Sequence, residues 1–219
     1  MTHTDMIAKV CNAAPVIPVL TIDRVEDAQP LARALVAGGL SALEITLRTA
    51  AAMEAIAAIA EVEGAMAGVG TLLTAAHIRD AKSAGATFGV SPGATETLIQ
   101  AAQDYDLPLL PGAGTATEAM RLLEQGFVFQ KFFPAEAAGG APALGSMAGP
   151  LPQITFCPTG GVTPENAKTY LALPNTRCVG WSWIAPKALI DAGDWDQITQ
   201  IARRAADLLA LHDPPVPRA

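Results

Sequence analysis

The sequence predicts a single-domain α/β protein, a (β/α)8 barrel of the TIM-barrel type, on the strength of two observations. Short apolar runs recur at regular intervals, and segments with the apolar spacing of helices separate them. Strands that alternate with helices pair in parallel, and eight such units in 219 residues close most naturally into a barrel. No Ser/Gly linker, charge block or low-complexity tract divides the chain. We therefore expect one domain over residues 1–219, with a helix at each terminus.

Eight apolar runs are expected to form the strands. In chain order they are VIPVL (16–20), ALEIT (42–46), MAGVGT (66–71), TFGVSP (87–92), LPLLPG (107–112), VFQKFFP (128–134), ITFCPTGG (154–161) and RCVGWSW (177–183). An open doubly wound sheet is the competing architecture, but it normally carries a glycine-rich phosphate turn after its first strand. The first run here continues as TIDRVED, which contains no glycine, so the barrel is favoured.

The segments between the runs have the features of helices. In VEDAQPLARALVAGG (25–39), Ala28, Leu31, Leu35 and Val36 fall on one stripe, and the segment ends in glycine. Three further segments, TAAHIRDAKSAGA, TETLIQAAQDY and TATEAMRLLEQG, each open with a threonine that is suited to cap a helix.

Composition and charge exclude several classes of protein. Hydrophobic residues make up 51% of the chain and charged residues 16%, which predicts a compact core rather than a disordered chain. A net charge of −7 offers no basic surface for nucleic acid. The apolar stretches fall short of the roughly 20 residues that span a bilayer, and the sequence begins without a secretory pattern. We expect no membrane or nucleic-acid partner and a cytoplasmic location.

Metal chemistry is not expected either. The three cysteines, at 11, 157 and 178, have no CxxC spacing, and the three histidines are scattered. This pattern disfavours both a disulfide scaffold and a catalytic zinc site. Any chemistry is therefore expected to depend on Lys, Glu, Arg, hydroxyl and backbone groups, without a metal or another cofactor.

Polar side chains gather at the ends of the expected strands, where barrel enzymes carry their catalytic groups. The period of two in LEITLR places Glu44, Thr46 and Arg48 on one face, opposite the aliphatic residues that suit the helix layer. In VFQKFFP, Lys131 falls between two aromatic residues on the same face, and Gln130 is expected to face the helix layer. An ammonium group is costly to bury without a partner, so Lys131 either extends to solvent or serves as a neutral amine.

A second group of polar positions follows the last two strands, the usual phosphate-binding corner of such barrels. Gly160, Gly161 and Ser182 lie there, where exposed N–H groups and a hydroxyl can hold an anion. The following VTPENA leads towards a helix start, whose dipole also favours phosphate.

The residues alone leave structural alternatives open. Lys131 is equally well explained as a structural lysine paired with Glu136 or Glu44, and Glu44 and Arg48 as an ion pair across one sheet face. Thr71 and Thr159 are also compatible with ordinary strand-end threonines, and glycines in TGG and SPG with simple turns.

Six motifs together resemble one enzyme family. LEITLRT, GVGT, SPG, QKFFPAE, PTGGVTPENA and GWSW, in this order and spacing, resemble the 2-keto-3-deoxy-6-phosphogluconate (KDPG) aldolases, the class I pyruvate aldolases of the Entner–Doudoroff pathway. The resemblance runs from about Val16 to the helix after Trp195. It implies an aldehyde-lyase that cleaves KDPG to pyruvate and glyceraldehyde 3-phosphate through a Schiff base, without a cofactor, and that forms a homotrimer.

The resemblance also implies roles for individual residues. Lys131 matches the Schiff-base lysine and Glu44 the general acid/base. The remaining positions match substrate-binding residues: Arg48 and Thr71 for the pyruvoyl carboxylate, Pro92 and Phe133 for the wall of that pocket, Thr159 for the substrate site, and Gly160, Gly161 and Ser182 for the phosphate. One position departs from the family pattern GGS, because Trp181 replaces its second glycine. This indole is expected to weaken phosphate binding unless it points towards the helix layer.

Three other functions are compatible with the sequence. Within the same lysine chemistry, the substrate is alternatively 2-keto-4-hydroxyglutarate or 2-keto-3-deoxy-6-phosphogalactonate. A phosphosugar epimerase or isomerase would use Lys131 only as a charge, and a non-catalytic barrel would bind a phosphorylated sugar acid without releasing pyruvate.

Overall fold

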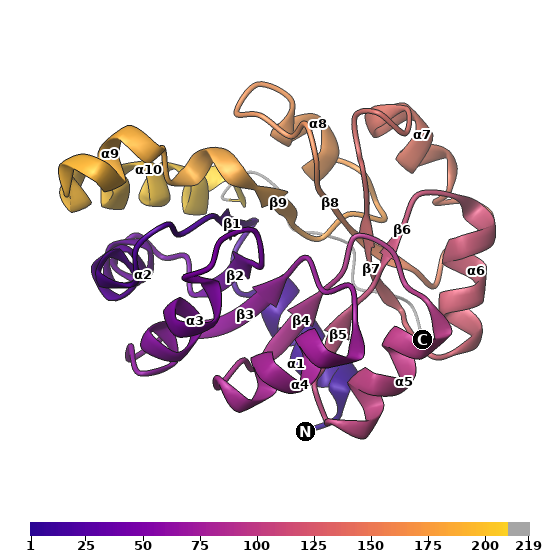
Figure 1. The fold of residues 1–219 in the computed structure, drawn as a ribbon. Coiled ribbons are helices and arrows are strands. Elements are labelled where there is room, and N and C mark those ends of the chain that lie inside the picture. The colour runs from indigo at the N-terminus through magenta and orange to yellow at the C-terminus, as the bar shows by residue number, and fades with distance from the viewer. Residues whose placement is uncertain (210–219) are drawn as a thin grey trace.

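A computed structural model describes residues 1–209 of the chain, in which strands and helices alternate (Figure 1). The strands are β1 (Val16–Leu20), β2 (Ala42–Thr46), β3 (Met66–Gly70), β4 (Phe88–Val90), β5 (Leu109–Leu110), β6 (Gly112–Ala113), β7 (Phe129–Phe132), β8 (Thr155–Pro158) and β9 (Val179–Trp181). The helices are α1 (His3–Asn12), α2 (Ala28–Ala37), α3 (Ala52–Ala60), α4 (Ala75–Ser83), α5 (Glu96–Asp104), α6 (Ala116–Glu124), α7 (Gly140–Ser146), α8 (Ala167–Leu171), α9 (Lys187–Ala192) and α10 (Trp195–Ala206), with 3-10 turns at Val25–Asp27, Ser182–Ile184 and Asp207–Leu209.

All strand pairs are parallel, as predicted, and they form two sheets. The larger sheet has the order β5-β4-β3-β2-β1-β9, and the smaller one has the order β6-β7-β8. Single parallel bridges, Phe156 with Thr176 and Thr159 with Gly180, connect β8 to the β9 segment. The prediction of a parallel α/β fold is therefore confirmed.

Each predicted run contains an observed strand, but the run at 107–112 contains parts of two. Pro111 separates β5 from β6, because a proline nitrogen has no hydrogen with which to continue a strand ladder. The chain otherwise passes directly from one sheet into the other, since Pro111 accepts a hydrogen bond of 2.8 Å from the Lys131 N–H group.

The predicted helix caps are confirmed. Thr74, Thr95 and Thr115 each accept a hydrogen bond from a backbone N–H group in the first turn of α4, α5 and α6, respectively. In α6 the cap is reciprocal, because the Glu118 carboxylate returns to the N–H group of Thr115. None of the helices in residues 1–209 is long and apolar enough to cross a membrane.

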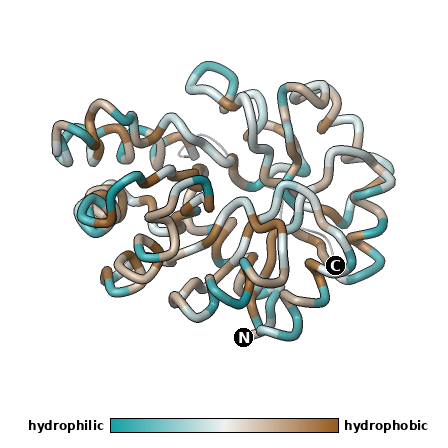
Figure 2. The backbone as a smooth tube through the Cα atoms, in the orientation of Figure 1, coloured by the Kyte–Doolittle hydropathy of each residue, from teal (hydrophilic) through white to brown (hydrophobic). Residues whose placement is uncertain are grey.

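The hydrophobic core has two parts that lie on opposite faces of the strands. The larger part packs strands against the surrounding helices and includes Leu43 and Ile45 of β2; Figure 2 shows apolar residues along the strands and polar residues on the outer turns of the helices. The smaller part joins Ile7, Val10 and Cys11 of α1 to Cys178, directly before β9, and to six strand residues: Ile17, Ala42, Phe88, Val90, Leu110 and Cys157. Helix α1 thus covers an apolar interior, and the three cysteines in it are free and buried.

Candidate active site

A buried lysine and a buried glutamate from different sheets meet at the centre of the candidate site. Lys131 of β7 and Glu44 of β2 expose only 5% and 3% of their surfaces. The Lys131 Nζ donates to the Glu44 Oε1 across 3.3 Å. Lys131 therefore does not extend to solvent, and Glu44 is its partner in place of Glu136, whose carboxylate accepts a hydrogen bond from Tyr170.

The period-two pattern of β7 explains why the lysine side chain points inward. Gln130, the preceding residue, is fully buried on the helix side, where its amide donates to the carbonyl oxygens of Ala119 and Phe127 at 3.0 and 2.9 Å. This confirms the predicted direction of Gln130 and leaves Lys131 on the opposite face. The Phe133 ring then borders the amine, with its centroid 5.4 Å from Nζ, close enough for a cation–π contact when the amine is charged.

Space for the Glu44 carboxylate depends on a glycine in the neighbouring strand. A Cβ atom at Gly70, the last residue of β3, would lie 2.6 Å from the Glu44 Cγ and closer still to its Oε1. Only glycine admits the carboxylate at this position. The sequence analysis quoted this glycine within GVGT but assigned it no role; its signal was a glycine on a strand paired in parallel with the glutamate strand.

The four residues proposed to form the carboxylate pocket each follow the end of a strand. Arg48 is exposed just beyond β2, and its guanidinium has no ion-pair partner within residues 1–209. Thr71, directly after β3, has a φ of +63°, which is rare for a β-branched residue and is typically retained at functional sites. Pro92 and Phe133 line one cavity of about 970 Å³, whose lining includes neither Arg48 nor Thr71.

The predicted phosphate corner is only partly assembled by contacts in the structure. Thr159 is buried and bridges to Gly180, where an added Cβ would lie 2.9 Å from the Thr159 Cγ2. Gly160 and Gly161 have φ values of +99° and +80°, which favour glycine. Ser182 is exposed and lines a different cavity of about 130 Å³ together with Lys187.

A short helix follows the glycines, as the sequence predicts. Helix α8 begins at Ala167, directly after a turn at residues 164–166, and has only 5 residues. The prediction that VTPENA (162–167) leads to a helix start is therefore confirmed, and the effect of that helix on phosphate stays a prediction. The turn arises because the Asn166 side chain binds both sides of it, accepting from the Thr163 N–H group at 2.7 Å and donating to the Gly161 carbonyl at 3.1 Å.

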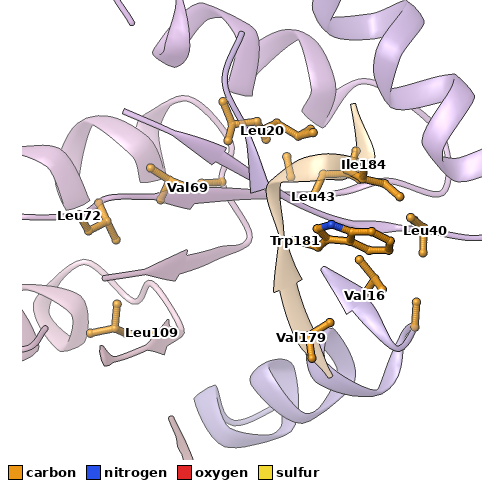
Figure 3. Packing of buried hydrophobic residues seen from close by; sticks show 14 of the residues in the cluster. Val16, Leu20, Leu40, Leu43, Val69, Leu72, Leu109, Val179, Trp181 and Ile184 are labelled. Carbon is orange, nitrogen blue, oxygen red and sulfur yellow. The ribbon is translucent and has the colours of Figure 1, made fainter. Parts of the chain in front are cut away.

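Trp181 points away from the glycine loop. Its side chain is buried in the larger core, where Figure 3 shows the indole among Val16, Leu40 and Ile184. Of the two outcomes considered for this residue, the structure shows the helix-facing one. The indole therefore occupies no space at the phosphate corner.

Comparison with known proteins gives a consistent picture. The family model "KDPG and KHG aldolase" matches residues 7–201. A 2-dehydro-3-deoxy-phosphogluconate aldolase from Pseudoalteromonas atlantica is 49% identical over 90% of this chain and 92% of its own. The crystal structure of the 2-keto-3-deoxy-6-phosphogluconate aldolase of Zymomonas mobilis with 3-phosphoglycerate has a TM-score of 0.88 at 47% identity, covering 94% of this chain and 97% of that one.

A further solved structure bears on the chemistry. The KDPG aldolase of Legionella pneumophila, with pyruvate captured as a covalent carbinolamine intermediate, has a TM-score of 0.87 at 44% identity and covers 90% of this chain and 96% of that one. A carbinolamine is the adduct of an amine and a carbonyl group, so a relative of this chain uses an amine to bind pyruvate covalently.

Proposed function

This chain belongs to the KDPG and KHG aldolase family, and on that premise we propose that it is a class I aldolase that cleaves 2-keto-3-deoxy-6-phosphogluconate to pyruvate and glyceraldehyde 3-phosphate. The observation that carries the proposal is the contact between the buried amine of Lys131 and the buried carboxylate of Glu44. Two charged groups buried this deeply each need an opposite charge beside them. A proton that passes from the ammonium to the carboxylate leaves a nucleophilic amine beside a carboxylic acid.

Covalent bonding to the substrate begins the reaction. The neutral Lys131 amine attacks the C2 carbonyl carbon, and the carbonyl oxygen takes up a proton to give a carbinolamine. A second proton lets this hydroxyl leave as water, and the nitrogen becomes an iminium. Glu44 is the group within reach of Nζ that supplies and removes these protons.

The iminium then accepts the electrons of the bond that breaks. Glu44, directly or through a water molecule, removes the C4 hydroxyl proton, and the C3–C4 electron pair moves towards the nitrogen. This yields the aldehyde and an enamine. Protonation of C3 and hydrolysis of the resulting iminium release pyruvate and restore the amine.

The residues around the amine hold the two ends of the substrate. The Arg48 guanidinium suits a carboxylate because its N–H groups form a planar fork, and Thr71, Pro92 and Phe133 complete that pocket. At the other end, Thr159 lines the substrate site, and Gly160, Gly161 and Ser182 bind the phosphate. The left-handed glycine backbone supports this assignment, since successive N–H groups in such a turn form a concave site for anions.

Two features of the architecture belong to the proposal. We infer that the two parallel sheets form one (β/α)8 barrel in a single domain, because Pro111 alone separates β5 from β6 and two bridges connect β8 to the β9 segment. A homotrimer and a cytoplasmic location stay predictions, which sedimentation velocity and cell fractionation test.

A second substrate is favoured by the name of the matched family, which includes the KHG aldolases. Cleavage of 2-keto-4-hydroxyglutarate to pyruvate and glyoxylate would use the same lysine. Turnover of this compound, of KDPG and of its galactonate epimer, each followed through pyruvate release with lactate dehydrogenase, separates these substrates.

Reduction in the presence of pyruvate tests the mechanism. Borohydride is expected to convert the pyruvate imine to a stable amine, with one adduct on Lys131 detected by peptide mass spectrometry. Lys131→Met should abolish the adduct, whereas Lys187→Met, which removes a lysine that is 69% exposed, should keep it. If Lys131 stayed unmodified in folded wild-type protein, the Schiff-base mechanism would be refuted. An epimerase or a non-catalytic barrel would give this result.

A further inference from the structure

The loop that follows β8 rests on the side chain of Glu136, a residue without a role in the proposed reaction. A Cβ atom at Gly161 would lie 2.6 Å from the Glu136 Cγ and 2.7 Å from its Cβ. Only a glycine at position 161 lets the backbone come this close to the Glu136 side chain. Loop and side chain fix each other's positions.

Backbone hydrogen bonds attach the same two segments. The Ala135 N–H group donates to the Thr159 carbonyl at 2.8 Å, and the Glu136 N–H group donates to the Gly160 carbonyl at 3.0 Å. These bonds extend the pairing of β7 with β8 beyond the ends of both strands. The Gly161 N–H group has no hydrogen-bond acceptor among residues 1–209.

The Glu136 carboxylate is itself held by a buried donor. The Tyr170 hydroxyl of α8 donates to the Glu136 Oε1, and the tyrosine exposes 0% of its surface. Burial and the Glu136 carboxylate raise the pKa of Tyr170, so that the hydroxyl keeps its proton. Tyr170 belongs to α8 and Glu136 to the segment between β7 and α7, so this contact joins two successive strand–helix units, which Figure 1 labels.

We propose that Glu136, fixed by Tyr170, is a positioning residue that holds the Gly160–Gly161 loop in its anion-binding conformation and thereby sets the affinity for the phosphate end of the substrate. The proposal rests on the proposed function, in which this loop binds phosphate. Glu136 acts through the loop and touches neither the amine nor the substrate.

The sign of the effect separates positioning from simple electrostatics. A carboxylate near a phosphate repels it, so that removing the charge would strengthen phosphate binding if charge alone mattered. A positioning role predicts the opposite for Glu136→Ala, because the loop loses the side chain on which it rests. Glu136→Gln removes the charge but keeps the shape and an oxygen that accepts from Tyr170, so it should bind phosphate nearly as well as the wild type.

The experiment compares a phosphorylated 2-keto-3-deoxy sugar acid with its unphosphorylated counterpart. Glu136→Ala should raise the KM for the phosphorylated acid about ten-fold, the typical effect of misplacing a donor to a charged oxygen. Its kcat, and its kcat/KM for the unphosphorylated acid, should stay at wild-type values. Tyr170→Phe should act in the same direction, and Glu165→Ala, which removes an exposed carboxylate from the same turn, should leave both values unchanged.

A measurement without catalysis keeps the two proposals separate. Titration calorimetry with inorganic phosphate should show weaker binding to Glu136→Ala than to the wild type and Glu136→Gln, with each variant's fold checked by circular dichroism. Failure of borohydride trapping in the wild type would remove the proposed function but leave this comparison intact. Unchanged or tighter phosphate binding by Glu136→Ala, or equal losses for the two sugar acids, would overturn the positioning role.

Discussion

Replacing Gly70 with alanine should move the Glu44 carboxylate while leaving every residue that touches the substrate chemically unchanged. The added Cβ would lie 2.6 Å from the Glu44 Cγ, whereas carbon atoms in favourable contact lie about 3.5–4.0 Å apart. The glutamate is buried, so it has to retreat by roughly 1 Å, the difference between these distances. The Lys131–Glu44 contact of 3.3 Å would then exceed hydrogen-bonding distance.

The expected result is a large loss of rate with a moderate loss of stability. Misplacement of a catalytic group by about 1 Å can lower a rate roughly 100-fold, which corresponds to about 2.7 kcal/mol in the activation free energy. Overpacking should also lower the free energy of unfolding by about 1–3 kcal/mol. Steady-state kinetics and the rate of borohydride trapping with pyruvate measure the loss of rate, and urea unfolding measures the loss of stability.

Gly89→Ala supplies the matched control. Its added Cβ would lie 2.5 Å from the Leu72 Cδ1, so it also crowds a buried side chain, but one without a catalytic role. We expect a comparable loss of stability and a wild-type rate per folded molecule. Wild-type kcat and trapping in Gly70→Ala would refute the argument that the position of the Glu44 carboxylate controls the reaction.

Three further predictions concern charge, pH and packing. Lys131→Met should lower the free energy of unfolding by about 3 kcal/mol, because it leaves the Glu44 carboxylate buried and unpaired; adding Glu44→Gln should restore stability in urea unfolding but not activity. Hydrogen bonding from the Gly114 N–H group holds the pKa of Glu118 below its ordinary value of 4.5. The carboxylate therefore contributes stability above pH 4.5 that is lost as the pH falls through its folded pKa. As the pH is lowered through this range, the melting temperature of Glu118→Gln should fall less steeply than that of the wild type. Trp181→Ala should cost about 3–5 kcal/mol of stability, with an unchanged KM for the phosphorylated substrate, since the indole packs in the core.

The sequence by itself determined the positions of the strands and the faces of their side chains. Alternation in LEITLR separated Glu44 from Leu43 and Ile45, and the structure places the latter two in the core against the helices. The threonines before α4, α5 and α6 identified the helix starts. These features depend on neighbouring residues, because the periods of strands and helices and the caps of helices are local properties of the chain.

Only the tertiary structure decided which residues meet. Glu44 pairs with Lys131 across 87 positions of sequence, whereas the sequence left both Glu136 and Glu44 as possible structural partners. The structure likewise turned Trp181 towards the helices, placed Gly70 against the carboxylate, and joined Tyr170 to Glu136. Such contacts depend on strand register and on the space left by packed side chains, and neither is encoded by the spacing of residues within one segment.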